Sequence, residues 1–180
     1  MLKARLAICA CIIGLSAGGA QAADAYGSVG VSSFNTDLLD AKLAVVQGRV
    51  GVKLLPYLGV EAEAGTGFSD DTSHVRYAPF IWTTTTELNY QVAGYVVGFL
   101  PLTEKAELFA RVGYGKAKFD YDWVIDNQSL SNSNSRDGWS YGGGGQYFFD
   151  GKNGVRLDYT RHDFDEDKVD AWSVGYVRRF

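Results

Sequence analysis

Hydrophobic residues alternate with polar or small residues over stretches of about ten positions along most of the chain after residue 24. In 43–55, Val50 and Val52 share one parity, whereas Arg49 and Lys53 share the other. A period of two is typical of a β-strand with one apolar face and one polar face. Almost no stretch shows the periodicity of an amphipathic helix. The pattern therefore predicts an all-β protein.

The alternation predicts eight strands, at 25–34, 43–55, 58–68, 86–100, 106–121, 138–149, 154–164 and 169–180. Short and long connections alternate between them. The short turns fall at 56–57, 101–105 and 150–153, the long polar segments at 35–42, 69–85 and 122–137, and an acidic connection at 164–168. An even number of strands with this alternation is the layout of a membrane barrel, whose closure leaves no unpaired edge in hydrocarbon. We therefore expect an all-β, eight-stranded antiparallel transmembrane β-barrel with short periplasmic turns and longer extracellular loops.

The first residues have the pattern of a secretory signal rather than a strand. Lys3 and Arg5 precede an apolar run over 6–15, and small residues flank Gln21 at the end of the segment. The run is shorter than the roughly 20 residues that a membrane-spanning helix needs. We therefore expect a signal peptide, removed before the protein folds.

The predicted boundaries are a signal peptide at 1–22 and one barrel domain at 23–180. Both cysteines, Cys9 and Cys11, lie in the signal peptide, which excludes disulfides and thiol chemistry from the mature chain. Removal of two basic residues changes the net charge from −4 to −6. An acidic exported domain is a poor candidate for nucleic-acid binding, so no nucleic-acid partner is expected.

Several segments resemble the repeated strand pattern of the OmpA and OmpX type of eight-stranded barrels: RVGVKL at 49–54, PLTEK at 101–105, LFARVGYG at 108–115 and VGY at 174–176. The terminal Phe180, on an amphipathic last strand, resembles the assembly signal of outer-membrane barrels. This resemblance implies location in the cell outer membrane and recognition of the C-terminal strand by the barrel-assembly machinery. It also implies contact with outer-membrane lipid and lipopolysaccharide.

Charged residues of both signs lie on the polar parities of the predicted strands: Arg49, Lys53, Glu61, Glu63, Glu107, Arg111, Arg156 and Asp158. A soluble barrel or sandwich would show the same alternation. However, the near balance of positive and negative residues on these faces suits a narrow lumen in which charges must pair. The short turn near Pro56 places positions 49 and 63 opposite each other. We therefore predict that Arg49 pairs with Glu63, with Glu61 and Lys53 nearby and with Arg111 and Arg156 in the same network. Because side chains fill an eight-stranded barrel, we expect a plugged lumen; the alternative is an ion path.

Aromatic residues near the predicted strand ends fit belts at the two membrane interfaces: Tyr57, Trp82, Tyr90, Trp123, Trp139, Tyr141, Phe148, Phe149 and Trp172. Carbohydrate stacking is the alternative for these rings. Arg178 falls on the lipid-facing parity of the last strand, where a long side chain can extend to the interface.

The sequence gives little support for a catalytic site or a metal site. The mature chain has two histidines, His74 in a predicted loop and His162 on a predicted strand, and the sequence around His162 differs from the His-x-Ser pattern of lipid A deacylases. By parity His162 points into the lumen, as a hydrogen-bonded interior histidine. The acidic segment 163–168 lacks the glycine and the distal glutamate of a calcium loop. We therefore expect no catalytic residue, no cofactor and no metal site.

The function predicted from the sequence is a structural or surface-interaction role, in adhesion or envelope integrity. It would act through surface loops at 69–85 and 122–137, because function in such barrels concentrates in the loops. Strand edges around 72–88 and 116–141 could also pair with partner strands. A narrow, porin-like channel and a lipid-modifying enzyme are the alternatives.

Overall fold

A computed structural model of the chain describes residues 24–36, 42–68, 71–77, 80–125, 128–164 and 167–180. These residues form nine strands: β1 (Asp24–Thr36), β2 (Lys42–Leu55), β3 (Leu58–Gly67), β4 (Asp71–Tyr77), β5 (Phe80–Pro101), β6 (Ala106–Ile125), β7 (Gln128–Phe148), β8 (Asn153–Phe164) and β9 (Asp167–Arg179). Among the same residues, no helix is long and apolar enough to span a membrane. The predicted signal peptide at 1–22 lies outside the described residues.

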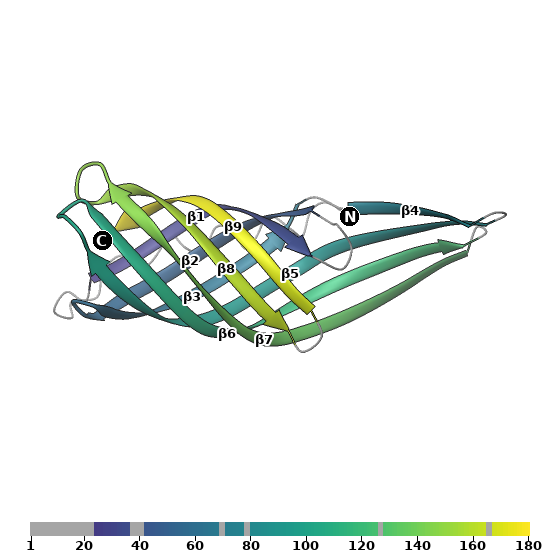
Figure 1. The fold of residues 1–180 in the computed structure, drawn as a ribbon, viewed down its shortest axis with the longest axis horizontal. Helices are drawn as coiled ribbons and strands as arrows, with labels where there is room; N and C mark the ends of the chain where they lie inside the picture. The colour runs from purple at the N-terminus through teal and green to yellow at the C-terminus, as the bar shows by residue number, and fades with distance from the viewer. Residues whose placement is uncertain (1–23, 37–41, 69–70, 78–79, 126–127, 165–166) are drawn as a thin grey trace.

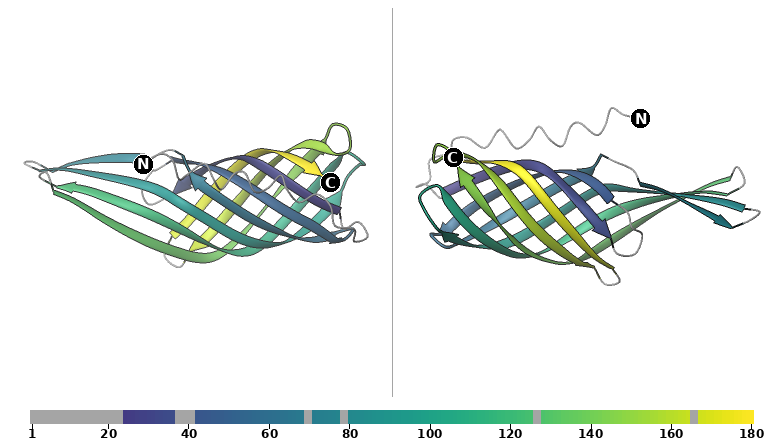
Figure 2. Two further views of the ribbon diagram at one scale, coloured as in Figure 1. Left: turned by 180° about the vertical axis from the view of Figure 1, so that it is seen from behind. Right: turned by 45° about the horizontal axis from the view of Figure 1, so that its top comes forward.

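Eight strands close into an antiparallel barrel, which confirms the predicted fold class (Figure 1). β1 pairs with β2 on one side and with β9 on the other, so the two ends of the barrel sequence lie side by side. β3 pairs with β5 over residues 58–65 and 91–98, which closes the barrel without β4. Figure 2 shows the same closed wall from two other directions. Closure gives the backbone groups within the wall partners on both sides.

One end of the barrel carries the short turns and the C-terminus (Figure 1); we call it the turn end. Gly151 in the β7–β8 turn has a φ of 80°, a left-handed conformation that glycine adopts without strain. In the same turn the Asp150 carboxylate accepts hydrogen bonds from the backbone N–H groups of Lys152 and Asn153, at 2.9 and 2.6 Å. These local hydrogen bonds fix the turn that joins β7 to β8.

At the opposite end, β4 and the distal parts of β5, β6 and β7 extend well beyond the barrel (Figures 1 and 2). We call residues 71–77, 80–87, 119–125 and 128–137 the arm. Within it β4 pairs with β5, β5 with β6, and β6 with β7. The long loops expected at 69–85 and 122–137 are therefore largely strands. Polar composition indicated loops, but backbone pairing does not require apolar side chains, and threonine favours strands.

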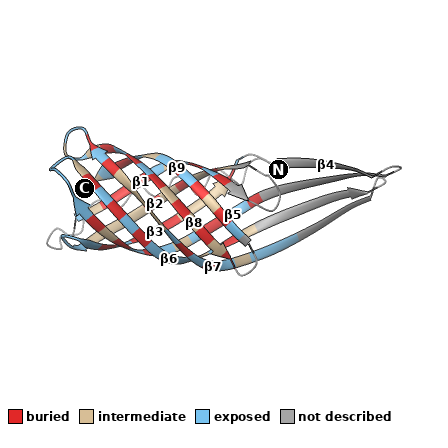
Figure 3. Ribbon diagram, viewed as in Figure 1, coloured by how far each residue is buried: buried red, intermediate tan, exposed pale blue. Residues whose placement is uncertain are grey.

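Burial alternates along the barrel strands (Figure 3). Outward positions expose large apolar side chains, such as Val96, Leu108 and Val174, while charged side chains such as Arg156 are almost completely buried inside. The interior also holds two clusters of buried hydrophobic side chains, but its charged groups and the apolar exterior reverse the arrangement of a soluble protein and suit a wall in contact with lipid.

One aromatic residue departs from the predicted belts. Phe148 is completely buried in the lumen, so the prediction that it lies in a belt is wrong. Phe148 is the last residue of β7 and points inward, whereas Phe149, which follows it at the start of the turn, is 57% exposed. Six predicted belt residues are exposed: Tyr57, Tyr90, Trp139, Tyr141, Phe149 and Trp172. Trp82 and Trp123 lie outside the residues whose side chains are described.

Candidate functional site

Six charged side chains meet in the middle of the lumen, and we call them the central cluster: Arg49, Glu61, Glu63, Arg111, Arg156 and Asp158. None of them is more than 4% exposed. They project from β2, β3, β6 and β8, so the cluster joins walls that are distant in sequence. Three positive and three negative charges balance within it, as burial of ionised groups requires.

Arg49 links two carboxylates on different strands. Its Nε lies 2.6 Å from Glu63 Oε2, the contact expected from the register that places residue 49 opposite residue 63. Its two terminal nitrogens donate to the two carboxylate oxygens of Asp158, at 2.9 and 3.0 Å. The planar guanidinium suits this arrangement because its five donors have fixed directions.

Arg111 bridges all three carboxylates of the central cluster. One terminal nitrogen donates to Glu61 Oε1 at 2.9 Å and to Glu63 Oε2 at 2.8 Å, and the other donates to Asp158 Oδ1 at 3.1 Å. The second nitrogen also donates to the Thr160 hydroxyl at 2.6 Å. Arg111 therefore holds β3 and β8 together across the lumen.

Arg156 completes the cluster by pairing with Glu61 through two hydrogen bonds, at 2.6 and 3.2 Å. Its guanidinium carbon also lies 4.0 Å from the centre of the Phe109 ring. Arg111 lies in the same way over Tyr95, at 4.4 Å. These rings add cation–π attraction while excluding water from the charged centre.

Neutral polar groups use the remaining acceptors of the carboxylates. Tyr26 donates its hydroxyl to Glu61 at 2.9 Å, Ser173 donates to Asp158 at 3.0 Å, and Gln91 donates its amide to Glu63 at 3.3 Å. These side chains and Thr160 are not among the site residues predicted from the sequence. Their positions have the same inward parity as the charged residues, which is the signal that could have found them.

Lys53 lies outside the central cluster, in contrast to the prediction that it is close to Arg49. Its Nζ lies 2.6 Å from Glu107 Oε2, nearer the turn end. Arg179 Nη2 lies 3.0 Å from the other Glu107 oxygen, and Gln146 also donates to this carboxylate. We call these four residues the turn-end cluster. Arg179 is not among the predicted site residues either, although its inward parity on β9 indicates a place in the lumen.

A serine and a histidine meet in the lumen near the central cluster. The Ser140 hydroxyl lies 2.8 Å from His162 Nδ1, across the β7–β8 ladder. Both are buried, and the imidazole lies between the rings of Phe34 and Phe164, at 5.5 and 5.8 Å. The contact is not apparent from the chain neighbours of His162, because it depends on the β7–β8 register. A hydroxyl and an imidazole in contact resemble a nucleophile and its base, but here both are buried in the lumen.

Among the described residues, no group of three or more His, Cys, Asp or Glu side chains is placed to hold a metal ion. The acidic segment 163–168 lies partly outside these residues, as do the side chains around His74. At the chain end, Phe180 is 64% exposed and its backbone N–H donates to the Ala25 carbonyl at 2.9 Å. Arg178 is exposed on the outward face of β9.

Solved structures with a similar fold are outer-membrane barrels. The outer membrane protein OprG of Pseudomonas aeruginosa matches with a TM-score of 0.66 and 13% identity, covering 90% of this chain and 98% of that chain. Ail, the attachment invasion locus protein of Yersinia pestis, solved with the heparin analogue sucrose octasulfate, matches with a TM-score of 0.61 and 17% identity, covering 87% and 98%. A major outer membrane protein of Thermus thermophilus has a TM-score of 0.61 and 14% identity, covering 87% and 99%. At these identities, the likeness shows a shared fold.

No curated protein sequence matches this chain. The family model described as the outer membrane protein beta-barrel domain matches residues 7–180, nearly the whole chain. This match agrees with the closed eight-stranded wall, its apolar exterior and its charged interior. The chain therefore belongs to the outer membrane protein beta-barrel domain family and resides in the cell outer membrane.

Proposed function

We propose that this protein is a surface-interaction protein: a barrel with a sealed lumen that anchors the arm outside the cell for contact with partner molecules. In barrels of this kind the short turns face the periplasm and the long connections face outward. The turn end is then periplasmic and the arm is extracellular. Such a role covers adhesion to another surface and envelope integrity through contact with neighbouring proteins.

The length of the arm strands carries this proposal. β5, β6 and β7 have 22, 20 and 21 residues. A tilted strand crosses the membrane in about 9–11 residues, so roughly half of each strand is not needed for crossing. β8 and β9, with 12 and 13 residues, stop near the length that crossing requires. Paired backbone beyond the membrane supports a function outside it.

The arm offers two strand edges to a partner. Among the described residues, β4 pairs with β5 alone, and β7 pairs with β8 only from Gly138 onward. The far side of β4 and the part of β7 before Gly138 therefore lie outside the strand ladders of the described residues. A partner in extended conformation can add to such an edge through main-chain hydrogen bonds.

The alternative of a narrow channel has less support. A conducting path needs a continuous polar route with suitable charge along it. The central cluster instead joins opposite walls and balances its own charge. The lipid-modifying alternative also has little support, because Ser140 and His162 are buried on the inward side of the wall rather than facing the lipid.

A trimmed variant tests the arm. Residues 69–88 and 120–133 are each replaced by an Asn-Gly turn, which closes β3 onto β5 and β6 onto β7 near the top of the barrel. Cells that display the full chain should adhere to cultured epithelial cells or immobilised matrix protein, whereas cells with the trimmed chain should lose most of this adhesion. Equal surface amounts are checked with an epitope tag, and an intact barrel by its slower migration on gels after heating.

The opposite result would count against the proposal. If the trimmed chain supported the same adhesion as the full chain, the arm would not be the interaction surface. If cells with the full chain adhered no better than cells with an empty vector, the result would argue against adhesion. Contact with neighbouring envelope proteins would then be tested by cross-linking.

A further inference from the structure

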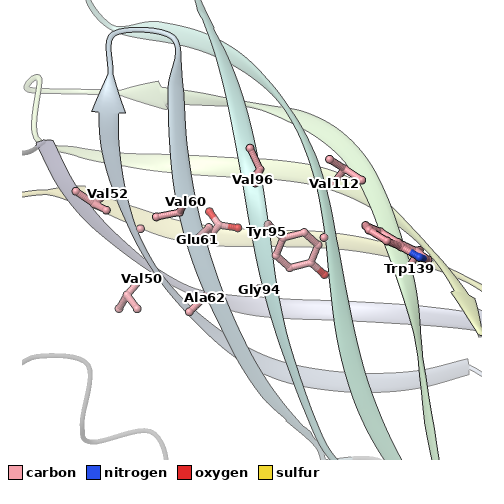
Figure 4. Close-up of a pocket in the computed structure, with 12 residues that line it drawn as sticks. Val50, Val52, Val60, Glu61, Ala62, Gly94, Tyr95, Val96, Val112 and Trp139 are labelled. Atoms are coloured by element: carbon pink, nitrogen blue, oxygen red, sulfur yellow. The ribbon is translucent and has the colours of Figure 1, made fainter.

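An apolar groove of about 700 Å³ lies on the outward face of the barrel (Figure 4). Its sides are outward-facing valines of four adjacent strands, β2, β3, β5 and β6: Val50, Val52, Val60, Val96 and Val112. Ala62 and Gly94 are paired across the β3–β5 ladder and form its floor, since their small size leaves the wall hollow there. A Cβ atom added at Gly94 would meet no other atom within 4 Å. The groove is therefore open to an acyl chain.

The groove lies within the hydrocarbon layer. Leu100, at the periplasmic end of β5, is 57% exposed, and Tyr90 on the same strand is exposed on the outer side. The segment from Tyr90 to Leu100 has about the length that a strand needs to cross the membrane. Gly94 lies between them, one residue to the outer side of the midpoint, so the groove is near the middle of the membrane. The acyl chain of an outer-leaflet lipid can therefore reach the groove from its outer end.

Two lysines of β6 stand at the outer end of the groove. Lys116 is paired with Val92 and Lys118 with Tyr90, so both lie toward the extracellular side of Gly94. At the level of Tyr90, an interfacial aromatic, lysine side chains reach the height of lipid headgroups. An apolar groove and a pair of ammonium groups thus follow each other along the same wall.

The charge at this place is available to a ligand. Lys116 is exposed, and neither lysine forms an ion pair with a described residue. Asp137, opposite Lys116 on β7, accepts a hydrogen bond from the Tyr114 hydroxyl. Lys116 and Lys118 therefore place two positive charges beside the outer end of the groove.

We propose that this groove and these lysines form a binding site for lipid A, the membrane anchor of lipopolysaccharide. One acyl chain would lie in the groove over Ala62 and Gly94, while a lipid A phosphate would accept hydrogen bonds from Lys116 and Lys118. The occupant is lipid A because the lysines stand at the outer end of the groove and lipid A combines several acyl chains with two phosphates. The flat apolar side of Trp139, 61% exposed beside the groove, would contact the same lipid.

Native mass spectrometry of the refolded mature chain in mild detergent tests the site, with bis-phosphorylated, hexa-acylated lipid A as the probe. Gly94→Leu fills the groove and should weaken lipid A binding at least tenfold. The double variant Lys116→Gln/Lys118→Gln should weaken it at least tenfold by a separate route. Lipid A that retains one phosphate should bind more weakly to the wild type, and phosphatidylglycerol at least tenfold more weakly.

Matched controls separate the site from general effects on the wall. Gly98 lies on the same strand outside the groove, and a Cβ there would approach only carbonyl oxygens at 3.9 and 4.0 Å, so Gly98→Leu adds the same bulk elsewhere. Lys105→Gln/Lys152→Gln removes the same charge from the turn end. Both controls should bind lipid A within twofold of the wild type.

Three results would overturn the proposal. Wild-type affinity in the groove and lysine variants would show that lipid A does not use this site. Equal losses in Gly94→Leu and Gly98→Leu would show a general effect of wall bulk. Equal binding of phosphatidylglycerol would show that the wall takes any anionic lipid. The lysine variant keeps the test decisive if Gly94→Leu does not fold.

Discussion

Replacement of Asp158 by asparagine should destabilise the barrel strongly, although the side chain keeps nearly the same shape. This carboxylate accepts two hydrogen bonds from Arg49, at 2.9 and 3.0 Å, and one from Arg111, at 3.1 Å. It also lies 3.4 Å from Arg156 Nε. Asp158→Asn would leave three buried guanidinium groups with only two carboxylates. The N–H groups of the asparagine amide would also point at the N–H groups of the arginines, where no acceptor is present.

The magnitude follows from the burial of the site. Asp158 is 1% exposed, so water cannot replace the lost charge without opening the lumen. Removal of one partner from a buried ion pair costs about 3–5 kcal/mol. We expect the free energy of unfolding of Asp158→Asn to fall within this range. Arg49→Met should cost a similar amount, because it leaves Glu63 and Asp158 short of donors.

The double variant should be more stable than the sum of the single effects implies. Arg49→Met/Asp158→Asn leaves two arginines and two carboxylates in the central cluster, which restores charge balance. Residues that share one ion-pair network typically couple by about 0.5–3 kcal/mol. We expect a coupling energy near the upper part of this range.

Urea-induced unfolding in phospholipid vesicles, followed by tryptophan fluorescence, measures these free energies. Asp163→Asn is the matched control, because Asp163 lies on the same strand with outward parity and forms no ion pair with a described residue. The control should change stability by less than about 0.5 kcal/mol. The reasoning would be refuted if Asp158→Asn were as stable as Asp163→Asn, or if the double variant showed simple additivity.

Three further results are expected. Phe148→Ala should lower the free energy of unfolding by about 3–5 kcal/mol, because it empties a buried position, whereas Phe149→Ala should change it little; equal effects in the urea assay would oppose the placement of Phe148 in the lumen. We propose Phe180 as the assembly signal, so Phe180→Ala should reduce the amount of protein in isolated outer membranes, and an unchanged amount would exclude that role. Hydrogen bonds from the backbone and side chain of Asn153 lower the pKa of Asp150 from 3.8 to about 2. The ionised carboxylate therefore stabilises the turn above about pH 4, and this contribution is lost as the pH falls through 2. A titration midpoint of Asp150 near 3.8, measured by carboxyl NMR, would contradict this shift.

The inward faces could be predicted because strand alternation and barrel closure act together. Once a strand is assigned to a closed wall, a period of two places alternate residues inside. The two-residue turn at 56–57 pairs Leu55 with Leu58, and a β-bulge between Lys53 and Leu55 shifts the register by one residue, so that Arg49 lies opposite Glu63. The short turn is visible in the sequence and brings the two residues close together, whereas the bulge fixes the exact pairing.

Contacts across the lumen could not be predicted in the same way. The partner of Lys53 is Glu107 on β6, and strands β3 and β5 lie between them in the wall. Which residues share a level inside the barrel depends on the stagger accumulated around all strands, and no single turn encodes it. The arm also differs from the predicted loops at 69–85 and 122–137, since these polar segments largely form strands. Strand pairing there is satisfied by the backbone, which composition does not report.

The most direct test of the sealed lumen is the single-channel conductance of the refolded mature protein in a planar bilayer. The Arg49→Ala/Glu63→Ala variant, which removes a contact of 2.6 Å from the central cluster, is measured beside the wild type. We expect no steady conductance from the wild type and at most brief openings from the variant. Steady, reproducible conductance of the wild type would contradict a sealed lumen and favour the channel.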